Sequence, residues 1–528
     1  MIPVLTSEQI RQADAHTIAN EPIASIDLME RAARACSDRI LSWLEAGSFG
    51  YGRGSKIIVL CGPGNNGGDG AAIARHLSEA GHQVTVIRSS NEASADNREM
   101  MRRLKKYDVS IKDLQETPID EIIGTTDVVI DALFGIGMSR SIEGKILELI
   151  RAVNSSGRPV IAIDMPSGLF TEDNGPNDQR SIINAHWTLT LEMPKLALLL
   201  PENARYSGRV EIVPIGLDRT YIDSLNASIH VIDEKDIIEL LPGRDKAAHK
   251  GSFGHALLIA GSVGKAGAAA LAAQASVRAG AGLVTVNVPS AVLPVVQQLV
   301  PEAMCTIGGD QWDIKHPDLK QFTAIGIGPG IGVNDDTSLL LKNLIISGEG
   351  KLVIDADGLN LLGENPTWLS FLPPGTILTP HPREFDRLSG SVASNDHERL
   401  MRAREMAMKY SCIIVLKSAR TAICDPNGKI FFNVTGNPGM ARGGSGDALT
   451  GLMTGLLAQR LSPLRAAILA VYLHGLAGDL CAAKRGMDGM TISELIAAIP
   501  EAWQLLRRRS QEILHGTFAY PDHFGITF

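Results

Sequence analysis

The sequence predicts a two-domain α/β protein in which each domain is built on a mainly parallel β-sheet. Three observations lead to this fold class. The chain has 528 residues, enough for two to four domains of about 150 residues each. Short apolar runs alternate with helix-like stretches from residue 56 onward, and parallel strands need such helical crossovers. The alternation weakens over residues 216–241 and then restarts, so we expect the domain boundary there.

The expected elements follow from hydrophobic periodicity. Residues 7–20 and 27–44 have a helical pattern, and Thr6 or Ser7 can cap the first of these helices. Strands of the first sheet are expected at IIVLC, VTVI, VVIDALFG and VIAID, with helices over residues 71–80, 98–106 and 144–153. Strands of the second sheet are expected at HALLIAG, LVTVNV, AIGIGPG, KLVIDADG and CIIVLK, and residues 447–509 are expected to be mostly helical. We assign residues 1–225 to the first domain, 226–512 to the second and 513–528 to a C-terminal tail.

The composition is typical of a globular protein in a reducing compartment. The formal net charge of −8 opposes binding to nucleic acid or to an anionic membrane. The six cysteines include no C-x-x-C pair, which favours reduced thiols over disulfides or a zinc site. The N-terminus lacks a signal-peptide pattern, and apolar runs such as residues 466–472 are shorter than the ~20 residues that span a membrane. We therefore expect a soluble cytoplasmic protein.

A glycine-rich segment, GPGNNGGDG, follows the first strand of the first domain at residues 62–70. Bare backbone at the start of a helix lets an anion approach free N–H groups, so a phosphate-bearing ligand is one interpretation. Gly62, Gly64 and Gly67 match G-x-G-x-x-G, but residues 88–90 after the next strand include no acid to hold a ribose. A tight structural turn is the other interpretation, and the segment alone does not decide between them.

Two further strand ends in this domain carry glycine and polar residues, DALFGIG at residues 131–137 and DMPSG at residues 164–168. Because parallel strands gather ligands beyond their carboxyl ends, these loops and the glycine-rich segment should converge on one pocket. Asn66, Asp131 and Ser167 offer hard oxygen ligands, which suit an alkali or alkaline-earth cation. Taken singly, Asp131 or Asp164 is explained equally well as the cap of a following helix.

Together with MPK at residues 193–195, these motifs resemble the N-terminal domain of the bifunctional NAD(P)H-hydrate repair enzymes, over most of residues 1–217. The resemblance implies a Rossmann-like fold and an epimerase that acts on NADH or NADPH hydrated across the nicotinamide ring. It implies that Asp164 faces the reacting centre and that Asn66, Asp131 and Ser167 bind potassium, K⁺. The substrate-binding residues that it implies are Asn65, Asn66, Gly67, Gly68, Asp69, Gly135, Ile136, Gly137, Met138, Ser139, Arg140, Ser141 and Asp164.

The chemistry agrees with these residue types. The hydrated carbon is bonded to the ring nitrogen and to a hydroxyl group, so loss and return of the hydroxyl scramble its configuration. A positioned carboxyl group relays the proton that this requires, and we assign that catalytic role to Asp164. Potassium is expected to order the loops.

The strongest motif of the second half is GNPGMARGGSGD at residues 436–447. Its last five residues open the helical run ALTGLMTGLLAQ, where backbone N–H groups can stabilise a phosphoryl group during transfer. Asp447 can then take the proton from an attacking hydroxyl, which makes it a catalytic candidate. The alternative is an acid that complements the helix dipole.

Other motifs of the second half have both a structural and a functional explanation. Gly251, Gly254 and the small residues at 264–269 suit a close ligand, but also close helix–sheet packing. A further glycine-rich run, GIGPGIG, follows at residues 326–332. His381 lies between two prolines and is either a site residue or part of a rigid turn. Asp355 and Asp357 either face a ligand or cap a helix.

These motifs resemble a ribokinase-like fold and, more narrowly, the ADP/ATP-dependent NAD(P)H-hydrate dehydratases, over residues 232–509. In that family a nucleotide phosphorylates the ring hydroxyl and elimination restores NADH or NADPH; bacterial-type members use ADP and form AMP. The resemblance implies hydrate contacts from Ala268, Gly330, His381 and Asp447, and nucleotide contacts from Lys417, Ser418, Ala419, Arg420, Thr421 and Gly446. Magnesium, Mg²⁺, is implied by phosphoryl transfer, without a compact ligand motif. Ser418 replaces a common glycine and Arg442 a common small residue.

The expected function is therefore a fused repair enzyme whose epimerase supplies its dehydratase. Its expected partners are the hydrates NADHX and NADPHX with ADP or ATP, and the resemblance implies a homo-oligomer. One alternative makes the second half a kinase of a small vitamin-like alcohol, because the same anion site serves that class. Another makes the first half a nucleotide-binding scaffold, which does not require Asn66, Asp131 and Asp164 together.

Overall fold

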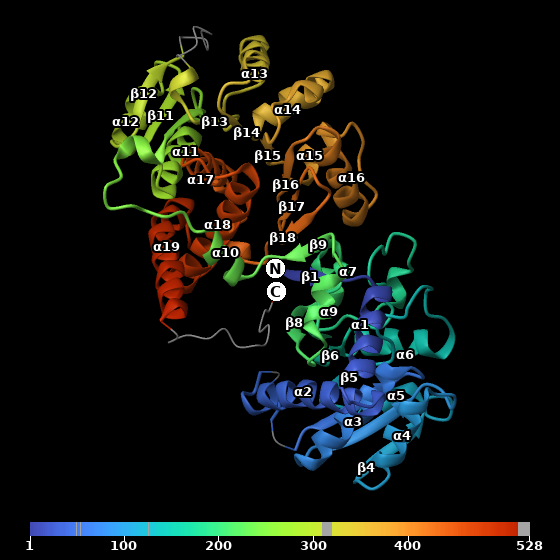
Figure 1. Cartoon of the computed structure of the whole chain (residues 1–528). Coiled ribbons are helices and arrows are strands. Elements are labelled where there is room, and N and C mark those ends of the chain that lie inside the picture. The colour runs from blue at the N-terminus through green and yellow to red at the C-terminus, as the bar shows by residue number, and fades with distance from the viewer. Residues whose placement is uncertain (49, 53, 125, 309–318, 516–527) are drawn as a thin grey trace. The chain divides into compact units, whose positions relative to one another are not determined.

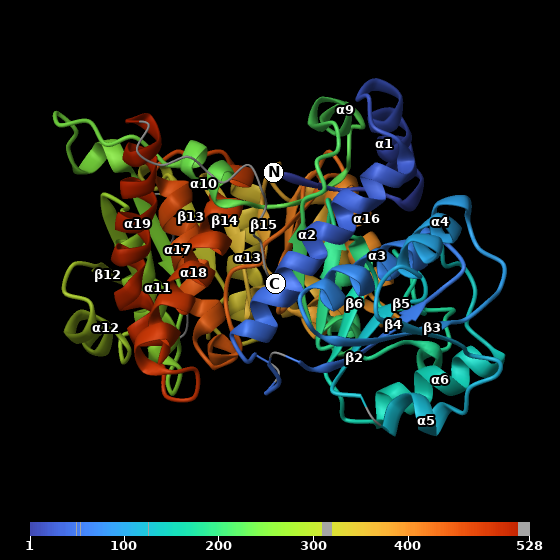
Figure 2. The ribbon, with the colours of Figure 1, turned by 90° about the horizontal axis from the view of Figure 1, so that it is seen from below.

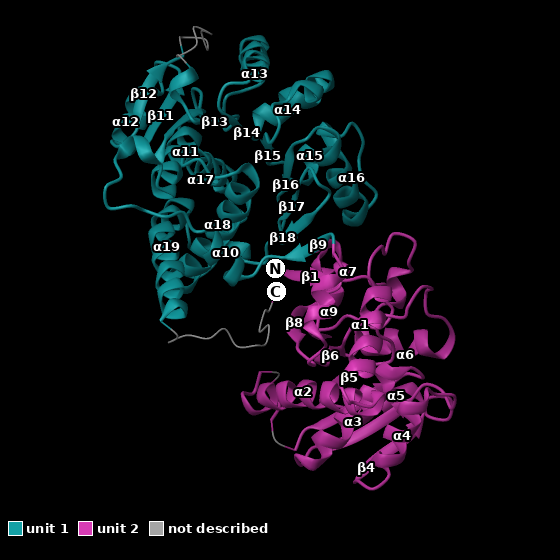
Figure 3. Cartoon of the chain, viewed as in Figure 1, with its two compact units in different colours: residues 1, 228–519 teal, residues 2–227, 520–528 magenta. Residues whose placement is uncertain are grey.

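The computed structural model describes residues 1–48, 50–52, 54–124, 126–308, 319–515 and 528 (Figure 1). The chain divides between residues 227 and 228 into two compact units (Figure 3). We call residues 2–227 the N-terminal unit and residues 228–515 the C-terminal unit, and describe each by itself. Residues 516–527 of the expected C-terminal tail lie outside the described residues.

The N-terminal unit is built on a seven-stranded sheet of order β4-β3-β2-β5-β6-β7-β8. All neighbouring strands are parallel, which confirms the predicted parallel sheet. The strands are β2 (Lys56–Cys61), β3 (Gln83–Arg88), β4 (Val109–Asp113), β5 (Val128–Ala132), β6 (Val160–Ile163), β7 (Trp187–Leu191) and β8 (Arg209–Val213).

Helices cover both faces of this sheet, as parallel strands require (Figure 2). Successive strand residues point to opposite faces. Ile57 and Val59 therefore pack against α2, α3 and α4, whereas Ile58 and Leu60 pack against α5 and α6. The unit begins with strand β1 (Ile2–Val4), and its helices are α1 (Ser7–Asn20), α2 (Ser25–Glu45), α3 (Asn65–Glu79), α4 (Ala95–Leu104), α5 (Ile119–Gly124), α6 (Gly144–Ser155), α7 (Leu196–Leu199), α8 (Ala204–Ser207) and α9 (Arg219–Ser224).

Helix α3 begins at Asn65 instead of at residue 71 as predicted, so most of the glycine-rich segment is helical. Close packing explains the glycines inside the helix. A Cβ atom at Gly67 would lie 2.0 Å from the Gly62 carbonyl oxygen, and one at Gly68 would lie 2.6 Å from Met29 Sδ. One at Gly70 would lie 2.6 Å from Ala132 Cβ. Sequence periodicity missed this start because glycines are poor helix formers.

The C-terminal unit is also built on a mainly parallel sheet, of order β9-β18-β17-β16-β15-β14-β13-β10-β11-β12. Only β17 runs antiparallel to its neighbours among the described strands of this order. The strands are β9 (Ile229–Val231), β10 (His255–Ile259), β11 (Leu283–Val288), β12 (Met304–Ile307), β13 (Ala324–Ile327), β14 (Lys351–Ile354), β15 (Ile377–Leu378), β16 (Ile413–Leu416), β17 (Ala422–Cys424) and β18 (Ile430–Phe432).

The helical end of the chain, expected over residues 447–509, is formed by α17, α18 and α19. Helix α17 contacts α11 closely, since a Cβ atom at Gly451 would lie 1.9 Å from the Ala272 carbonyl oxygen. The helices are α10 (Glu234–Leu240), α11 (Ala266–Ala279), α12 (Leu293–Leu299), α13 (Asp335–Ser347), α14 (Asp357–Glu364), α15 (Pro382–Leu388), α16 (Asp396–Lys409), α17 (Ser445–Ala458), α18 (Pro463–Arg485) and α19 (Ile492–Leu514).

Helix α18 is long and apolar enough to cross a membrane by length and composition, which the shorter apolar run at residues 466–472 did not suggest. However, 72% of its apolar window is buried inside the protein. A buried core helix passes the same test of length and composition.

Candidate active sites

The N-terminal unit holds a cavity of about 1270 Å³ beyond the carboxyl ends of its strands. Loops that follow β2, β5, β6 and β7 line it, as does helix α1. The predicted site residues that line this cavity are Asn65, Asn66, Asp69, Gly135, Ile136, Gly137, Met138, Ser139, Arg140, Ser141 and Asp164. Gly67 and Gly68 are not among its lining residues.

Asp164 is held in the cavity wall by a buried lysine. Lys195 is 1% exposed, and its Nζ lies 2.6 Å from Asp164 Oδ1. The same ammonium donates to Thr190 Oγ1 at 3.0 Å and to the Leu191 carbonyl oxygen at 2.9 Å, so its three hydrogens are used. Asp164 has a φ of 65°, a left-handed conformation that non-glycine residues adopt mainly where function or packing imposes it.

The loop after β5 approaches this carboxylate closely. A Cβ atom at Gly135 would lie 2.9 Å from Asp164 Oδ2 and 3.5 Å from Asn66 Cγ. Gly135 therefore keeps open the space between the predicted catalytic acid and the start of α3.

Two further acids that line the same cavity, Asp69 and Asp14, have raised pKa values. Asp69 is 7% exposed, and burial, followed by the charges of Asp164 and Asp14, raises its pKa well above the usual range. Burial, followed by the charge of Asp164, raises the pKa of Asp14 to about 6. Asp14 is not among the residues predicted from sequence; the available signal was an acid beside Ile10, Ala13 and Thr17, which are buried residues of α1.

Glu192 also lines the cavity and fixes part of its wall. It follows β7, has a φ of 56°, and its Oε2 accepts hydrogen bonds from the backbone N–H groups of Ile215 at 2.6 Å and Gly216 at 2.9 Å. Since Ile215 and Leu217 line the cavity, this carboxylate fixes part of the wall.

Asp131 and Ser167 are in direct contact behind the cavity. Ser167 donates from Oγ to Asp131 Oδ1 at 2.6 Å and from its backbone N–H to Oδ2 at 2.7 Å. Burial raises the pKa of Asp131 to about 6 in spite of these hydrogen bonds. No cationic side chain of the described residues pairs with Asp131.

Asn66 provides an oxygen that lacks a partner. Its Nδ2 donates to the Ile163 carbonyl oxygen at 3.2 Å, while its Oδ1 is buried without a hydrogen bond within the described chain. An uncompensated carboxylate and an unpartnered amide oxygen at neighbouring strand ends fit a hard cation.

In the C-terminal unit, Asp447 lies in the first turn of α17. Gly444, with a φ of 95°, precedes the helix, and the first N–H groups of a helix have no partner within it. Burial, followed by the charge of Asp355, raises the pKa of Asp447 to about 6, although Lys417 opposes this.

Lys417 and the buried Asp355 form an ion pair beside this helix start. Lys417 Nζ lies 2.7 Å from Asp355 Oδ1, and Thr450 Oγ1 of α17 donates to Asp355 Oδ2 at 2.7 Å. Burial lowers the pKa of Lys417, but the charges of Asp355 and Glu384 outweigh it and raise that pKa. A Cβ atom at Gly446 would lie 3.4 Å from Lys417 Nζ.

Neither acid of the DADG motif caps α14, which has no side-chain cap. Asp355 bonds Lys417 and Thr450, and Asp357 Oδ2 accepts from the Gly332 N–H at 2.8 Å and lies 3.3 Å from Lys265 Nζ. Of the two explanations from sequence, helix capping is therefore wrong.

His381 caps helix α15, as the rigid-turn explanation predicts. Its Nδ1 accepts hydrogen bonds from the N–H groups of Arg383 at 3.1 Å and Glu384 at 3.2 Å. Its Nε2 lies 3.5 Å from Glu384 Oε1, and Glu384 Oε2 lies 3.8 Å from Lys417 Nζ. The capping role thus also connects His381 to the Lys417 cluster.

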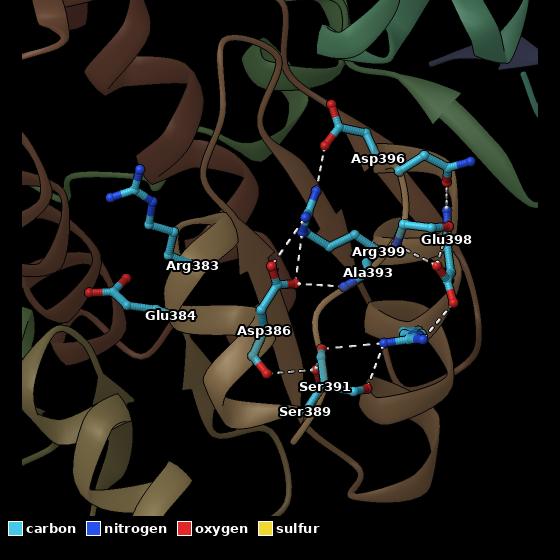
Figure 4. A network of polar contacts seen from close by, with 12 residues as sticks. Arg383, Glu384, Asp386, Ser389, Ser391, Ala393, Asp396, Glu398 and Arg399 are labelled. Carbon is cyan, nitrogen blue, oxygen red and sulfur yellow. Dashed lines mark hydrogen bonds and ion pairs between the residues drawn. The ribbon is translucent and has the colours of Figure 1, made fainter. Parts of the chain in front are cut away.

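A polar network holds α15 against α16. Arg399 donates from Nε to Asp386 Oδ1 at 3.0 Å and from Nη2 to Oδ2 at 3.2 Å. Figure 4 shows the Arg383 and Glu384 side chains pointing away from this network. The network therefore fixes the helix that presents Glu384 to Lys417.

The remaining predicted residues form two groups. Gly330 meets the start of α11, since a Cβ atom there would lie 3.2 Å from Ala268 Cβ. Ser418 donates to the Arg420 carbonyl oxygen at 2.7 Å, and Thr421 Oγ1 donates to the Ser418 carbonyl oxygen at 3.2 Å. The turn over residues 417–421, which includes Ala419, is thus closed by its own polar groups.

Two residues have contacts that the motifs did not predict, Arg442 before α17 and His474 in α18. Arg442 donates to the carbonyl oxygens of Gly439 at 3.2 Å, Met487 at 3.3 Å and Asp488. His474 of α18 has a buried Nε2 without a hydrogen-bond partner within the described chain. Burial, followed by the charge of Lys417, lowers the pKa of His474 to about 4.

Comparison with known proteins finds relatives of both units. The sequence model of the NAD(P)H-hydrate dehydratase family matches residues 256–501, and that of the YjeF-related protein N-terminus matches residues 25–197. The bifunctional NAD(P)H-hydrate repair enzyme Nnr of Moorella thermoacetica is 34% identical over 531 residues, covering 97% of this chain and 98% of that protein. The protein of the same name from Coxiella burnetii is 35% identical over 502 residues, covering 94% and 98%.

A solved structure matches the C-terminal half. It is the ADP/ATP-dependent NAD(P)H-hydrate dehydratase from Bacillus subtilis, co-crystallised with ATP and Mg²⁺. The two chains are 31% identical with a TM-score of 0.47, and the match covers 52% of this chain and 98% of the other.

Proposed function

The chain belongs to the family of bifunctional NAD(P)H-hydrate repair enzymes, and on that premise we propose how its two units divide the repair. The N-terminal unit interconverts the R and S forms of hydrated NADH and NADPH, and the C-terminal unit dehydrates the S form. The observation that carries the proposal is a buried carboxylate paired with a lysine in each unit. These pairs are Asp164 with Lys195, and Asp355 with Lys417 beside Asp447.

In the epimerase site, Asp164 acts as an acid–base group at the carbon where the hydroxyl is lost and added again. The cavity of about 1270 Å³ exceeds the usual range for drug-sized ligands, as a dinucleotide requires. Gly135 leaves room next to Asp164 Oδ2, and residues 135–141 line the adjoining wall. Asn65 and Asp69 contact the substrate from the start of α3, whereas Gly67 and Gly68 act indirectly, because their close packing allows the helix to begin at this place.

Asn66, Asp131 and Ser167 would hold K⁺ in this unit. Their fit rests on the unpartnered Asn66 Oδ1 and on the uncompensated charge of the buried Asp131. When bound, the ion supplies the compensating charge that these oxygens lack. Because Ser167 also donates its Oγ hydrogen bond to Asp131, the cation orders the loops after β5 and β6 at the back of the cavity.

In the dehydratase site, Asp447 accepts the proton of the ring hydroxyl as that oxygen attacks the nucleotide phosphorus. The N–H groups at the start of α17 bind the phosphoryl group in transfer. Lys417, Ser418, Ala419, Arg420, Thr421 and Gly446 contact the nucleotide, and Ala268, Gly330 and His381 contact the hydrate. With ADP as donor the products are AMP and a phosphate ester, which eliminates phosphate to restore the nicotinamide ring.

Mg²⁺ would bind mainly through the nucleotide. Within the described residues, no group of three or more His, Cys, Asp and Glu side chains is placed to hold a metal ion. Mg²⁺ typically keeps several waters and binds through substrate phosphates with one or two carboxylates. The ion would supply charge neutralisation for the transferred phosphoryl group.

The partners that these two reactions require are small molecules, NADHX or NADPHX with ADP or ATP. The net charge of −8 opposes association with nucleic acid or an anionic membrane. We place the protein in the cytoplasm as a homo-oligomer.

Separated epimers test the division of labour. Purified S hydrate with ADP, K⁺ and Mg²⁺ should regain the absorbance of reduced nicotinamide in wild-type protein and in Asp164→Asn, but not in Asp447→Asn. Purified R hydrate should be recovered by wild-type protein, and in Asp164→Asn only at the uncatalysed epimerisation rate. A stable phosphorylated alcohol without regained absorbance would show a small-molecule kinase instead.

A further inference from the structure

Helix α1 is fixed over the epimerase cavity at both ends. At its start, Ser7 Oγ donates to the Ile136 carbonyl oxygen at 3.1 Å and lies 2.8 Å from Thr171 Oγ1. Near its end, Thr17 Oγ1 accepts from the Asp218 N–H at 3.0 Å, and His16 stacks on Tyr221 with ring centroids 3.9 Å apart. The helix is therefore part of the cavity wall and not a loose N-terminal extension.

Asp14 lies on the side of α1 that lines this cavity. Residues 7, 10, 14 and 17 follow helical spacing and share one face of the helix, and Ile10 and Asp14 both line the cavity. Among the described residues, no hydrogen bond or ion pair holds the Asp14 carboxyl. Asp14 therefore differs from Glu192, whose carboxylate is occupied by backbone N–H groups.

Asp14 and Asp164 differ in their partners. Asp164 forms an ion pair with the buried Lys195 at 2.6 Å, whereas no cationic side chain of the described residues pairs with Asp14. Burial first, then the negative charges of Asp164 and Glu192, raise the pKa of Asp14 to about 6, although Lys195 lowers it. The buried Asp69 of α3 is a further carboxyl group of this wall.

Two acid–base groups match the stereochemistry of the reaction. When the hydroxyl leaves, the carbon becomes part of a planar C=N bond with two faces. Inversion requires the old oxygen to leave from one face and a new oxygen to add to the other. One carboxyl group, fixed on one side of the ring, does not reach both oxygens at hydrogen-bond distance.

We propose that Asp14 is a second catalytic residue of the epimerisation, an inference that rests on the function proposed above. The Asp14 carboxylic acid donates its proton to the departing hydroxyl, and the Asp164 carboxylate accepts a proton from the water that adds on the opposite face. For the reverse epimer the two residues exchange roles.

Each step balances. The C–O bond breaks, its electron pair leaves with the oxygen as water, and the ring nitrogen lone pair forms the C=N bond. A water oxygen then forms the new C–O bond, the C=N pair returns to nitrogen, and Asp164 takes the released proton. Transfer of that proton from Asp164 to Asp14 through water in the cavity restores the starting state, without an oxidant or a reductant.

Asp14→Asn tests this role in the full-length protein, with Glu8→Gln as the matched control. Glu8 is the other acid of α1, and its side chain is 70% exposed. We expect Asp14→Asn to lower the kcat of R-to-S conversion about 100-fold or more and to change KM less than threefold. We expect Glu8→Gln to match wild type, and both variants to dehydrate the S epimer at the wild-type rate.

The pH profile separates catalysis from positioning. Wild-type kcat/KM for epimerisation should fall on both sides of an optimum, and Asp14→Asn should lose one limb, whereas Asp14→Glu should restore the limb and part of the rate. An Asp14→Asn enzyme with wild-type rate, or with a lower rate but an unchanged two-limbed profile, would overturn the proposal. Failure of the wild-type protein to interconvert the epimers would instead refute the epimerase function itself.

Discussion

Replacing Asp447 by asparagine should remove the base of the phosphoryl transfer while leaving the site nearly isosteric. Asp447 lies in the first turn of α17, and its neighbours Asp355 and Lys417 are paired with each other. Loss of a positioned general base typically costs 10²- to 10⁴-fold in rate, which corresponds to about 3–5 kcal/mol of transition-state stabilisation. We expect dehydration of the S epimer to slow by this factor.

The pH dependence of dehydration gives a second, independent test of Asp447 as the base. Because the Asp447 pKa is raised to about 6, the base is ionised above that pH and protonated below it. Wild-type kcat/KM should therefore be level at pH 7–8 and fall about tenfold per pH unit below pH 6. Asp447→Asn should lack this limb.

Neighbouring charges should move the midpoint of that limb in opposite directions. Lys265 lowers the Asp447 pKa and Asp357 raises it, so Lys265→Met should shift the midpoint upward and Asp357→Asn should shift it downward. The Lys265→Met shift should be small, because the Lys265 side chain is 54% exposed and solvent screens its charge.

The assay follows the absorbance of reduced nicotinamide with purified S epimer, ADP and Mg²⁺ over pH 5–8. Epimerase activity on the same preparations serves as the internal control for folding. An Asp447→Asn rate within tenfold of wild type, or a limb near pH 6 that persists in the variant, would refute the assignment of Asp447 as the base.

Three further outcomes follow from the structure. Replacing K⁺ by a bulky organic cation should lower the free energy of unfolding of the N-terminal unit. The decrease is about 2.7 kcal/mol if K⁺ had been present at one hundred times its Kd. Calorimetry should show this decrease in wild type but not in Asn66→Ala. Lys195→Met should destabilise the same unit by about 3–5 kcal/mol, because it leaves the Asp164 charge buried without its partner; denaturant unfolding measures this, and an unchanged midpoint would contradict it. Because the folded-state pKa of His474 is lowered to about 4, its contribution to stability is present above its unfolded pKa of about 6.5 and is lost as pH falls toward 4. The C-terminal unit of His474→Leu should therefore gain up to about 3 kcal/mol of stability relative to wild type between pH 7 and pH 4, and parallel stability curves for the two proteins would rule this out.

Much of the fold could be predicted because its signals are local. Apolar runs bounded by glycine and polar residues predicted β2 and β5, and helical periodicity predicted α1 with its observed ends. The start of α3 could not be predicted, because glycines are poor helix formers. Gly67 and Gly68 are required there by close contacts with Gly62 and Met29, and these contacts exist only in the folded structure.

Some residues of the candidate sites could likewise be predicted from local sequence, and others could not. Asp164 and Asp447 follow strand ends or open a helix, and such positions are readable from sequence. Asp14 and Lys195 could not be assigned, since the one is 150 residues from Asp164 in the chain and the other becomes informative only through its burial. Likewise, the pairing of Asp355 with Lys417 depends on sheet order, which places β14 and β16 on either side of β15.

The most direct test of the proposed repair function gives the wild-type protein an equal mixture of R and S hydrates with excess ADP, K⁺ and Mg²⁺, over a time short compared with uncatalysed epimerisation. We expect complete recovery of reduced nicotinamide with one AMP formed per hydrate repaired. Recovery that stops at half of the hydrate would contradict the epimerase assignment, and no recovery at all would contradict the repair function.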